Sequence, residues 1–218
     1  MPPEHIVLGI DESGKGDFFG PLVIASFLAD DRMLSRLTDM GVRDGKLISV
    51  KRTLEIDDWL RDQFVHEVIV LTPVQYNQRY REIKNLNKLL AAGHAEAIAR
   101  VAKTNRVDLA VSDKFGKPEL IEGELGRRKV NINLKQIVRG ESILQVAAAS
   151  ILARARFIRE MERLSVECGM ELPRGAAPKV DQAGRQLVRR LGPEILEKVA
   201  KLHFKNYSRI VNPTLFEG

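Results

Sequence analysis

The stretch that decides the fold is IVLGIDESGKGDFFG, residues 6–20. It begins with an apolar run, 6–10, that is typical of a buried β-strand. Two adjacent carboxylates, Asp11 and Glu12, follow this run, and two glycines then flank Lys15. Carboxylates at a strand end suit a hard divalent cation, which takes oxygen ligands, and glycines beside a lysine let a backbone approach a phosphate closely. The stretch therefore suggests phosphodiester chemistry, whereas the simpler interpretation is a strand that ends in a polar, glycine-rich turn.

The spacing of the two carboxylates sets a condition on this strand. Side chains alternate between the two faces of a strand, so Asp11 and Glu12 cannot both point one way in regular β geometry. For both to serve one site, we expect the strand to bend or end at Glu12. Gly14 and Gly16 would supply the backbone freedom that such a change of direction needs.

Composition limits the class of protein. The chain has 218 residues, of which 44% are apolar, so it can build a full core. No apolar run is long enough to span a membrane, and the first residues lack a basic segment leading into an apolar signal core. The single cysteine, Cys168, excludes an internal disulfide and a cysteine-cluster zinc site. We expect a cytoplasmic protein, without membrane or protein partners, that acts as a monomer.

The net charge of +6 is concentrated toward the C-terminus. Residues 174–209 hold nine Lys or Arg against three Asp or Glu, which leaves the rest of the chain nearly neutral. A basic region of this kind suggests a polyanion partner such as nucleic acid. The alternative is a solvated basic helix face.

The order of the predicted elements is that of an α/β fold. Strands are predicted over 5–11, 20–28, 64–71, 107–111 and 129–138. Helices are predicted over 31–40, 50–62, a short segment from Pro73, 84–104, 141–163 and 181–202. We interpret residues 1–218 as one domain, with a helical C-terminal appendage at about 172–210.

Two further carboxylates extend the first pair. Asp113 comes just after a buried apolar strand, where ligands gather in open sheets, although an aspartate there is also common as a helix cap or turn residue. Glu141 begins a helix whose alanines at 147–149 would let it lie close to the sheet, although a carboxylate in a first turn also favours the helix dipole. Together with Asp11 and Glu12 they could hold two divalent ions about 3.5–4 Å apart, which suits in-line attack on a phosphodiester. Spacing alone leaves open whether the four residues meet.

The motifs resemble those of the type 2 ribonucleases H, and those of ribonuclease HIII more than those of ribonuclease HII. Lys15 stands where ribonuclease HII usually has an arginine. The blocks that carry the resemblance are DESGKGDFFGPL at 11–22, YN at 76–77, NLNKLLA at 85–91, GES at 140–142, LPRGA at 172–176 and AKLHF at 200–204. The blocks run from residue 8 to about 206 in the order of the family.

This resemblance implies an RNase H-like fold, with a mixed sheet of about five strands flanked by helices and a helical C-terminal region. It implies hydrolysis of the RNA strand of RNA–DNA hybrids, leaving 3′-hydroxyl and 5′-phosphate ends. The catalytic and metal-binding residues that it implies are Asp11, Glu12, Asp113 and Glu141. The implied metal is Mg²⁺, with Mn²⁺ as a substitute.

The resemblance also implies residues that bind the substrate. Gly14, Lys15 and Gly16 would follow the RNA strand near the scissile bond, and reading 2′-hydroxyls in a shallow minor groove is how a protein can tell RNA from DNA. Lys46 matches a lysine that the family has near the substrate, although it could equally be an ordinary surface lysine. We expect His94, in the helix over 84–104, to be a packed or capping histidine.

One departure from the family concerns the region before the first strand. Ribonuclease HIII normally carries an N-terminal substrate-binding domain that resembles the TATA-binding protein fold, whereas this chain starts five residues before its first strand. We therefore expect substrate affinity to come from the catalytic domain, with 174–209 as the candidate surface. Two alternatives stay open: a ribonuclease HII-like junction nuclease that incises at single ribonucleotides in DNA, and a noncatalytic hybrid-binding protein, which the intact set of carboxylates disfavours because clustered carboxylates without a metal repel one another.

Overall fold

A computed structural model of the chain describes residues 5–43 and 48–212, so the predicted substrate contact Lys46 lies outside the described residues. The chain divides into two compact units. What we call the sheet unit comprises residues 1–13, 23–69 and 85–156, and what we call the helical unit comprises 14–22, 70–84 and 157–218. The interpretation of the chain as one domain stays a prediction.

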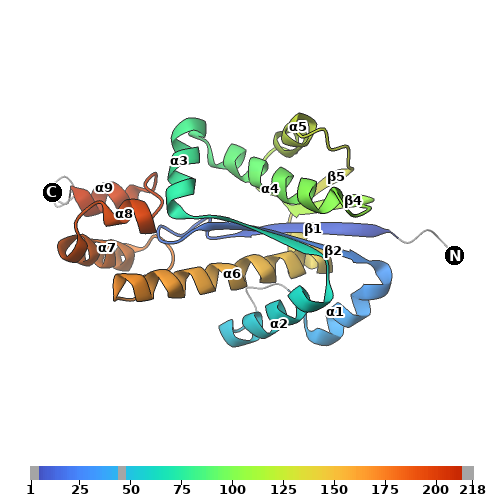
Figure 1. Ribbon diagram of the computed structural model, residues 1–218, viewed down its shortest axis with the longest axis horizontal. Helices are drawn as coiled ribbons and strands as arrows, with labels where there is room; N and C mark the ends of the chain where they lie inside the picture. Colours follow the sequence, from blue (N-terminus) through green and yellow to red (C-terminus); the bar gives the residue numbers. More distant parts are fainter. Residues whose placement is uncertain (1–4, 44–47, 213–218) are drawn as a thin grey trace. The chain divides into compact units, whose positions relative to one another are not determined.

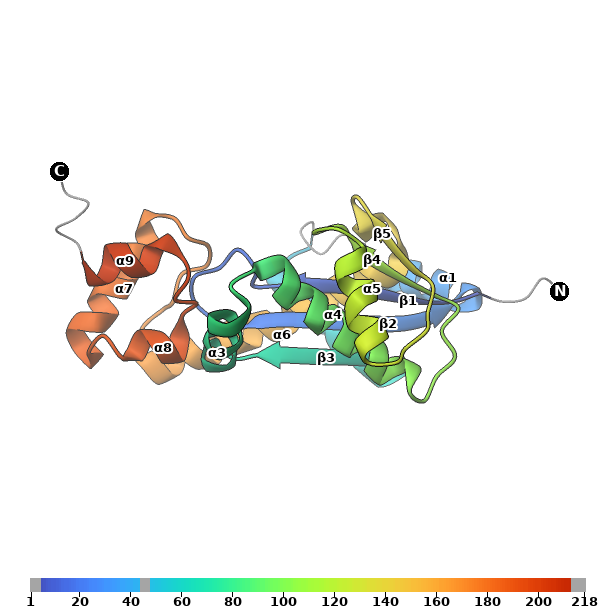
Figure 2. The ribbon, with the colours of Figure 1, turned by 90° about the horizontal axis from the view of Figure 1, so that it is seen from above.

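A five-stranded sheet in the order β3-β2-β1-β4-β5 forms the centre of the fold (Figure 2). Its strands are β1 (Ile6–Ser13), β2 (Leu22–Asp30), β3 (His66–Leu71), β4 (Leu109–Asp113) and β5 (Leu134–Ile137). Strand β1 runs antiparallel to β2 and parallel to β4, and β4 runs parallel to β5. Every residue of β2 is buried, as expected of a strand inside a covered sheet. The predicted mixed sheet of about five strands is confirmed.

Helices cover both faces of this sheet (Figure 1). They are α1 (Leu34–Met40), α2 (Val50–Gln63), α4 (Leu86–Ala102), α5 (Glu119–Arg127) and the first half of α6 (Leu144–Cys168). Helices α4 and α5 lie on one face, and α1, α2 and α6 lie on the other. Side-chain caps fix where two of them begin: Ser49 accepts a hydrogen bond from the Arg52 N–H at α2, and Asn85 accepts one from the Lys88 N–H at α4. Among the described residues, no helix combines the length and the apolar character that crossing a membrane requires.

Two glycines let helices approach the sheet closely, one on each face. A Cβ at Gly9 of β1 would lie 2.1 Å from the backbone carbon of Gln145, so α6 packs directly on the strand backbone. A Cβ at Gly93 of α4 would lie 2.1 Å from the Ile24 side chain of β2. The backbone of α6 therefore contacts that of β1 at Gly9, just before the two carboxylates Asp11 and Glu12.

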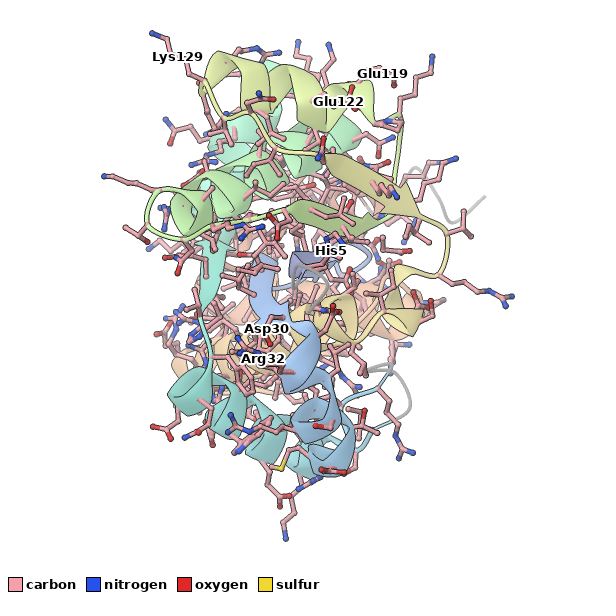
Figure 3. All side chains as sticks on the ribbon, turned by 90° about the vertical axis from the view of Figure 1, so that its right-hand side faces the viewer. His5, Asp30, Arg32, Glu119, Glu122 and Lys129 are labelled. Atoms are coloured by element: carbon pink, nitrogen blue, oxygen red, sulfur yellow. The ribbon has the colours of Figure 1, made fainter. Side chains whose placement is uncertain are left out.

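The end of β2 is capped by Asp30, which accepts hydrogen bonds from the backbone N–H groups of Arg32 and Met33. This caps the 3-10 turn η1 (Asp31–Met33), and the Arg32 guanidinium lies 3.0 Å from the same carboxylate. Figure 3 shows this pair on one side of the sheet, with Glu119 and Glu122 of α5 on the other. The pair therefore stabilises the turn that follows β2.

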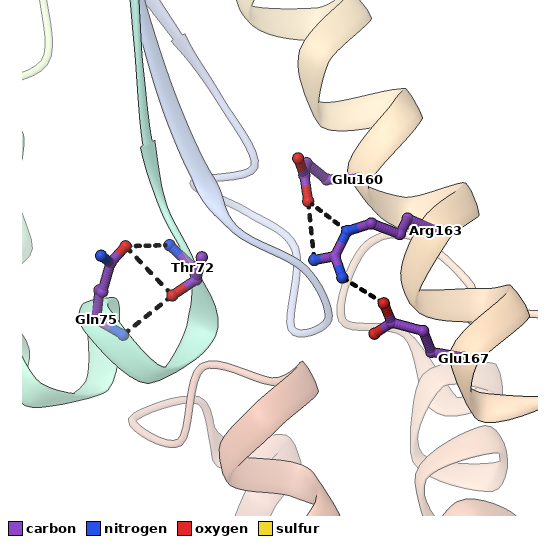
Figure 4. A network of polar contacts seen from close by, with 5 residues as sticks. All are labelled: Thr72, Gln75, Glu160, Arg163 and Glu167. Carbon is purple, nitrogen blue, oxygen red and sulfur yellow. Dashed lines mark hydrogen bonds and ion pairs between the residues drawn. The ribbon is translucent and has the colours of Figure 1, made fainter.

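The helical unit contains α3 (Pro73–Ile83), the second half of α6, α7 (Pro178–Leu191), α8 (Ile195–Val199) and α9 (Lys205–Val211). Helix α3 begins with a capping box, in which the Thr72 hydroxyl accepts from the Gln75 N–H and the Gln75 side chain accepts from the Thr72 N–H (Figure 4). On α6, Arg163 lies between Glu160 and Glu167, as the figure also shows. Such pairs at helical spacing support an exposed helix face.

The structure corrects three details of the prediction. Helix α6 begins at Leu144 rather than at Glu141, which lies in a separate 3-10 turn, η3 (Gly140–Ser142). Strand β5 is shorter than the predicted 129–138. Helices α5 and α9 were not predicted: α5 contains Gly123 and Gly126, which weaken a helical pattern, and α9 has only seven residues.

Candidate functional site

The first two candidate carboxylates lie on opposite faces of β1. The strand pairs Asp11 with Ala25 and Glu12 with Ile24, and its ladder continues to Ser13. The strand therefore does not end at Glu12, because its pairing with β2 continues for one more residue. The pleat then sends the two side chains to opposite sides.

Asp11 faces α6. Its carboxylate accepts a hydrogen bond from the Ser150 side chain of that helix and, at 2.8 Å, from the backbone N–H of Glu12. Burial, together with the negative charges of Glu12 and Asp113, raises the pKa of Asp11 to about 7, while the two hydrogen bonds oppose the shift. Glu12 and Asp113 are thus close enough for their charges to act on Asp11.

Glu12 faces α4. Its Oε2 lies 3.1 Å from Nε2 of His94, and its side chain is only 9% exposed. His94 is fully buried, and its ring packs against Phe115 with 4.7 Å between ring centroids. The expectation that His94 is only a packed or capping residue missed this contact, which joins positions 82 residues apart and has no signal in the local sequence.

Asp113 and Glu141 are carried by other elements, the strand β4 and the turn η3, which contact each other. Asp113 is the last residue of β4, the strand beside β1, and its Oδ1 accepts a hydrogen bond from the Gly140 N–H at 3.0 Å. A Cβ at Gly140 would lie 3.0 Å from the Asp113 Cα, so the two backbones touch. Glu141 directly follows Gly140 in the turn η3, so its backbone lies next to the point where this turn contacts Asp113.

These carboxylates offer oxygen ligands only, which is the chemistry of Mg²⁺ and Mn²⁺ sites. Among the residues that the structure describes, no three His, Cys, Asp or Glu side chains have the arrangement of a metal-ion ligand set. Asp11, Glu12 and Asp113 each form at least one polar contact with another group of the protein. The donor set still fits a divalent cation, because its charge would offset the repulsion that raises the pKa of Asp11.

The glycine-rich loop after β1 belongs to the helical unit. Gly14 has a φ of +87°, and a Cβ there would lie 2.2 Å from the Pro21 carbonyl oxygen, so only glycine fits. Gly16 is exposed, and a Cβ there would meet nothing within 4 Å. Packing therefore explains Gly14, while the space beside Gly16 stays open to a partner.

A buried lysine holds this loop in place. Lys201 is fully buried, and its Nζ donates hydrogen bonds to the carbonyl oxygens of Asp17 at 2.8 Å and Gly20 at 2.7 Å. Burial lowers the pKa of Lys201 to about 7, although the nearby charge of Asp17 acts in the opposite direction. In the sequence Lys201 belongs to the basic region 174–209 and to the AKLHF block, whereas the structure makes it an internal support.

A basic pocket is formed by the start of α4 and the segment that follows Asp113. It has a volume of about 620 Å³. It is lined by Asn85, Asn87, Lys88, Lys114, Phe115, Gly116, Lys117 and Leu120. No carboxylate lines it, and the ammonium groups of its three lysines have no ion-pair partner among the described residues. Its charge is therefore available to an anion.

Comparison with protein families places nearly the whole chain in one of them. The model described as ribonuclease HII matches residues 8–207. Ribonuclease HIII of Protochlamydia amoebophila is 39% identical over 204 residues, which cover 94% of this chain and 68% of that protein. Ribonuclease HIII of Bacillus licheniformis is 36% identical over 215 residues, covering 94% of this chain and 69% of that protein.

Solved structures agree with these relatives. The crystal structure of Bst-RNase HIII in complex with Mn²⁺ matches with a TM-score of 0.89 and 32% identity, covering 95% of this chain and 69% of that one. Ribonuclease H2 from Pyrococcus horikoshii OT3 matches with a TM-score of 0.79 at 23% identity, covering 97% of this chain and 100% of that one, and so shares the fold.

Proposed function

Because the chain belongs to the ribonuclease HII family, we propose that it is a metal-dependent endoribonuclease that hydrolyses the RNA strand of RNA–DNA hybrids. The observation that carries this proposal is the position of Asp11, Glu12 and Asp113 near the ends of two neighbouring strands, where the charges of Glu12 and Asp113 act on the buried Asp11. A protein gains nothing in stability from gathering carboxylates in this way. A bound cation gives the arrangement a purpose.

We assign metal binding to Asp11, Glu12, Asp113 and Glu141. Mg²⁺ is the proposed ion and Mn²⁺ its substitute, supported by the Mn²⁺ complex of Bst-RNase HIII. When bound, such ions supply a water of lowered pKa and stabilise the charge on a departing 3′ oxygen. The four side chains would have to turn toward a common point, and hydrogen bonds orient three of them, Asp11, Glu12 and Asp113, before the metal binds.

The glycine-rich loop is the proposed contact with the RNA strand. Gly14 sets the path of the loop, Gly16 leaves its backbone open, and Lys15 adds a positive charge between them. Backbone groups beside small residues can approach a sugar and its 2′-hydroxyl closely. Lys46 keeps its proposed role near the substrate on the strength of the sequence alone.

Phosphate binding is the proposed role of the basic pocket defined above. Lys114 and Lys117, which follow the strand that carries Asp113, and Lys88 of α4 have no acidic partners among the described residues, and together they form a surface that attracts a nucleic-acid backbone. A pocket of about 690 Å³ also contains Asp108 and Glu122. Another, of about 620 Å³, holds four basic side chains, of which Arg106 and Arg128 are paired with carboxylates. The lysine pocket is thus a second candidate surface besides the basic segment 174–209.

The competing functions are less well supported. Curated relatives at 36–39% identity carry the name ribonuclease HIII, which favours cleavage of hybrids over incision at single ribonucleotides. The retained carboxylates disfavour a noncatalytic hybrid-binding protein. The expected cytoplasmic location and monomeric state remain part of the proposal.

The decisive experiment compares two substrates under two metals. An all-RNA strand paired with DNA and a DNA duplex that contains one ribonucleotide are each incubated with the protein in Mg²⁺ and in Mn²⁺. We expect cleavage of the hybrid, with 3′-hydroxyl and 5′-phosphate ends, and no cleavage in a chelator. Cleavage confined to the single-ribonucleotide duplex would instead identify the junction nuclease.

A further inference from the structure

His94 stands out among the buried polar groups because its partner is a candidate metal ligand. Its side chain is 0% exposed, yet it is not packed among apolar groups alone, since Nε2 lies 3.1 Å from Oε2 of Glu12. An ionised carboxylate can only accept hydrogen bonds, so toward an ionised Glu12 the Nε2 atom acts as the donor. The other ring nitrogen, Nδ1, has no hydrogen-bond partner. The polar chemistry of the ring is therefore directed at Glu12.

The position of this ring is itself determined by the segment that carries another carboxylate. Phe115 packs on the His94 ring at a centroid distance of 4.7 Å, and Phe115 lies two residues after Asp113. The helix brings the ring close to the sheet, because Gly93 packs on Ile24, the residue that pairs with Glu12 in β2. The packing of α4 on β2 and the contact with Phe115 thus position the His94 ring.

We propose that His94 is a positioning residue, which holds Glu12 through one carboxylate oxygen so that the other oxygen faces a divalent cation. The inference rests on the metal-dependent function proposed above. A carboxylate ligand that is held by a neighbouring donor loses less rotational freedom when the metal binds, and partners of this kind typically contribute about 10- to 100-fold to metal affinity. Without the donor, Glu12 would have to be ordered by the metal itself.

Two substitutions separate this role from simple packing. His94→Phe keeps an aromatic ring against Phe115 but removes the donor, whereas His94→Gln keeps an N–H donor but removes the ring. If His94 positions Glu12, Gln restores function and Phe does not; if His94 only fills space, the order is reversed. Ile98→Ala, in the same helix at a fully buried site, serves as a control that destabilises the helix packing without removing a hydrogen bond to Glu12.

The measurement is Mn²⁺ binding to the full chain without nucleic acid, followed by the loss of the free Mn²⁺ signal in electron paramagnetic resonance. We expect binding about 10- to 100-fold weaker in His94→Phe, within about threefold of the unmodified protein in His94→Gln, and unchanged in Ile98→Ala. Hybrid cleavage by His94→Phe should recover as Mn²⁺ is raised. If His94→Phe does not fold, His94→Leu takes its place as the variant without a donor.

The proposal is overturned if a folded His94→Phe or His94→Leu binds Mn²⁺ as tightly as the unmodified protein, or if His94→Gln binds as weakly as they do. Its failure is distinguishable from failure of the proposed function. If only the role of His94 is wrong, the unmodified protein still cleaves hybrids, but Mn²⁺ affinity does not change with the residue at position 94. If the proposed function is wrong, the variants bind Mn²⁺ with the expected order of affinities, but the unmodified protein does not cleave hybrids.

Discussion

Asp11 and Glu12 are neighbours in β1, yet they serve opposite faces of the sheet: Asp11 is bonded to Ser150 of α6, and Glu12 lies 3.1 Å from His94 of α4. This follows from the uninterrupted pairing of β1 with β2 as far as Ser13. Two helices that cover different faces therefore each support one carboxylate. A site built from both must lie beyond the edge of the sheet, where Asp113 and the turn that contains Glu141 also end.

The first prediction concerns Asp113. Asp113→Asn keeps the shape of the side chain but removes a negative charge from the candidate metal site. We expect cleavage of RNA–DNA hybrids to fall at least ~1000-fold, equivalent to about 4 kcal/mol of transition-state stabilisation, while hybrid binding stays measurable by fluorescence anisotropy. Asp108→Asn is the matched control, because Asp108 precedes the same strand and is bonded to Arg106 and Ile6. Full activity of Asp113→Asn in Mg²⁺ would refute the site assignment.

The second prediction compares the two candidate binding surfaces through salt dependence. Replacing Lys114 and Lys117 with Ala should weaken hybrid binding and lower the slope of log K against log[salt] by up to about 0.9 for each phosphate that is no longer neutralised. Replacing two exposed lysines elsewhere in the sheet unit, Lys51 and Lys103, should leave the slope unchanged. Equal slopes for both double variants would remove the lysine pocket from the binding surface.

The same assay tests the basic region near the C-terminus. Changing Arg185, Arg189 and Arg190 to Glu should weaken binding and flatten its salt dependence if helix α7 contacts the hybrid. Arg190 already donates to the Gly169 carbonyl at 3.3 Å, so the other two arginines should carry most of the effect. A slope equal to that of the unmodified protein would leave α7 as a solvated basic face.

How much of this could be predicted from sequence depends on the range of the interaction. The strands were predictable because apolar runs reveal buried strands locally, and Asp11 and Asp113 were identified by their position after such runs. The contact of His94 with Glu12 and the contact of Lys201 with Gly20 join residues that are 82 and 181 positions apart, and local patterns hold no information on such pairs. Helix α5 was hidden because Gly123 and Gly126 interrupt its pattern.

The third prediction uses the pKa of Lys201. Its usual value of 10.5 applies to the unfolded chain, and burial lowers it to about 7 in the folded protein. Between these values the unfolded state binds more protons, so the free energy of unfolding should rise with pH, by up to about 1.4 kcal/mol per pH unit. Urea unfolding at pH 7.5, 8.5 and 9.5 measures this slope. Lys201→Met should flatten it, and should weaken hybrid binding because the carbonyls of Asp17 and Gly20 lose their donor.

The fourth prediction tests the close approach of α6 to β1. Gly9→Ala would place a Cβ about 2.1 Å from the Gln145 backbone, and neither a helix backbone nor a paired central strand can move aside cheaply. We expect a loss of roughly 3 kcal/mol in the free energy of unfolding, measured by urea denaturation. Gly123→Ala is the matched control: a Cβ there meets nothing within 4 Å, and alanine favours the helix α5, so a gain of about 0.5–1 kcal/mol is expected. Because Asp11 lies two residues after Gly9 on the same face, Gly9→Ala should also weaken Mn²⁺ binding, whereas Gly123→Ala should not. Equal stability of the two variants would mean that α6 is not held against the backbone of β1.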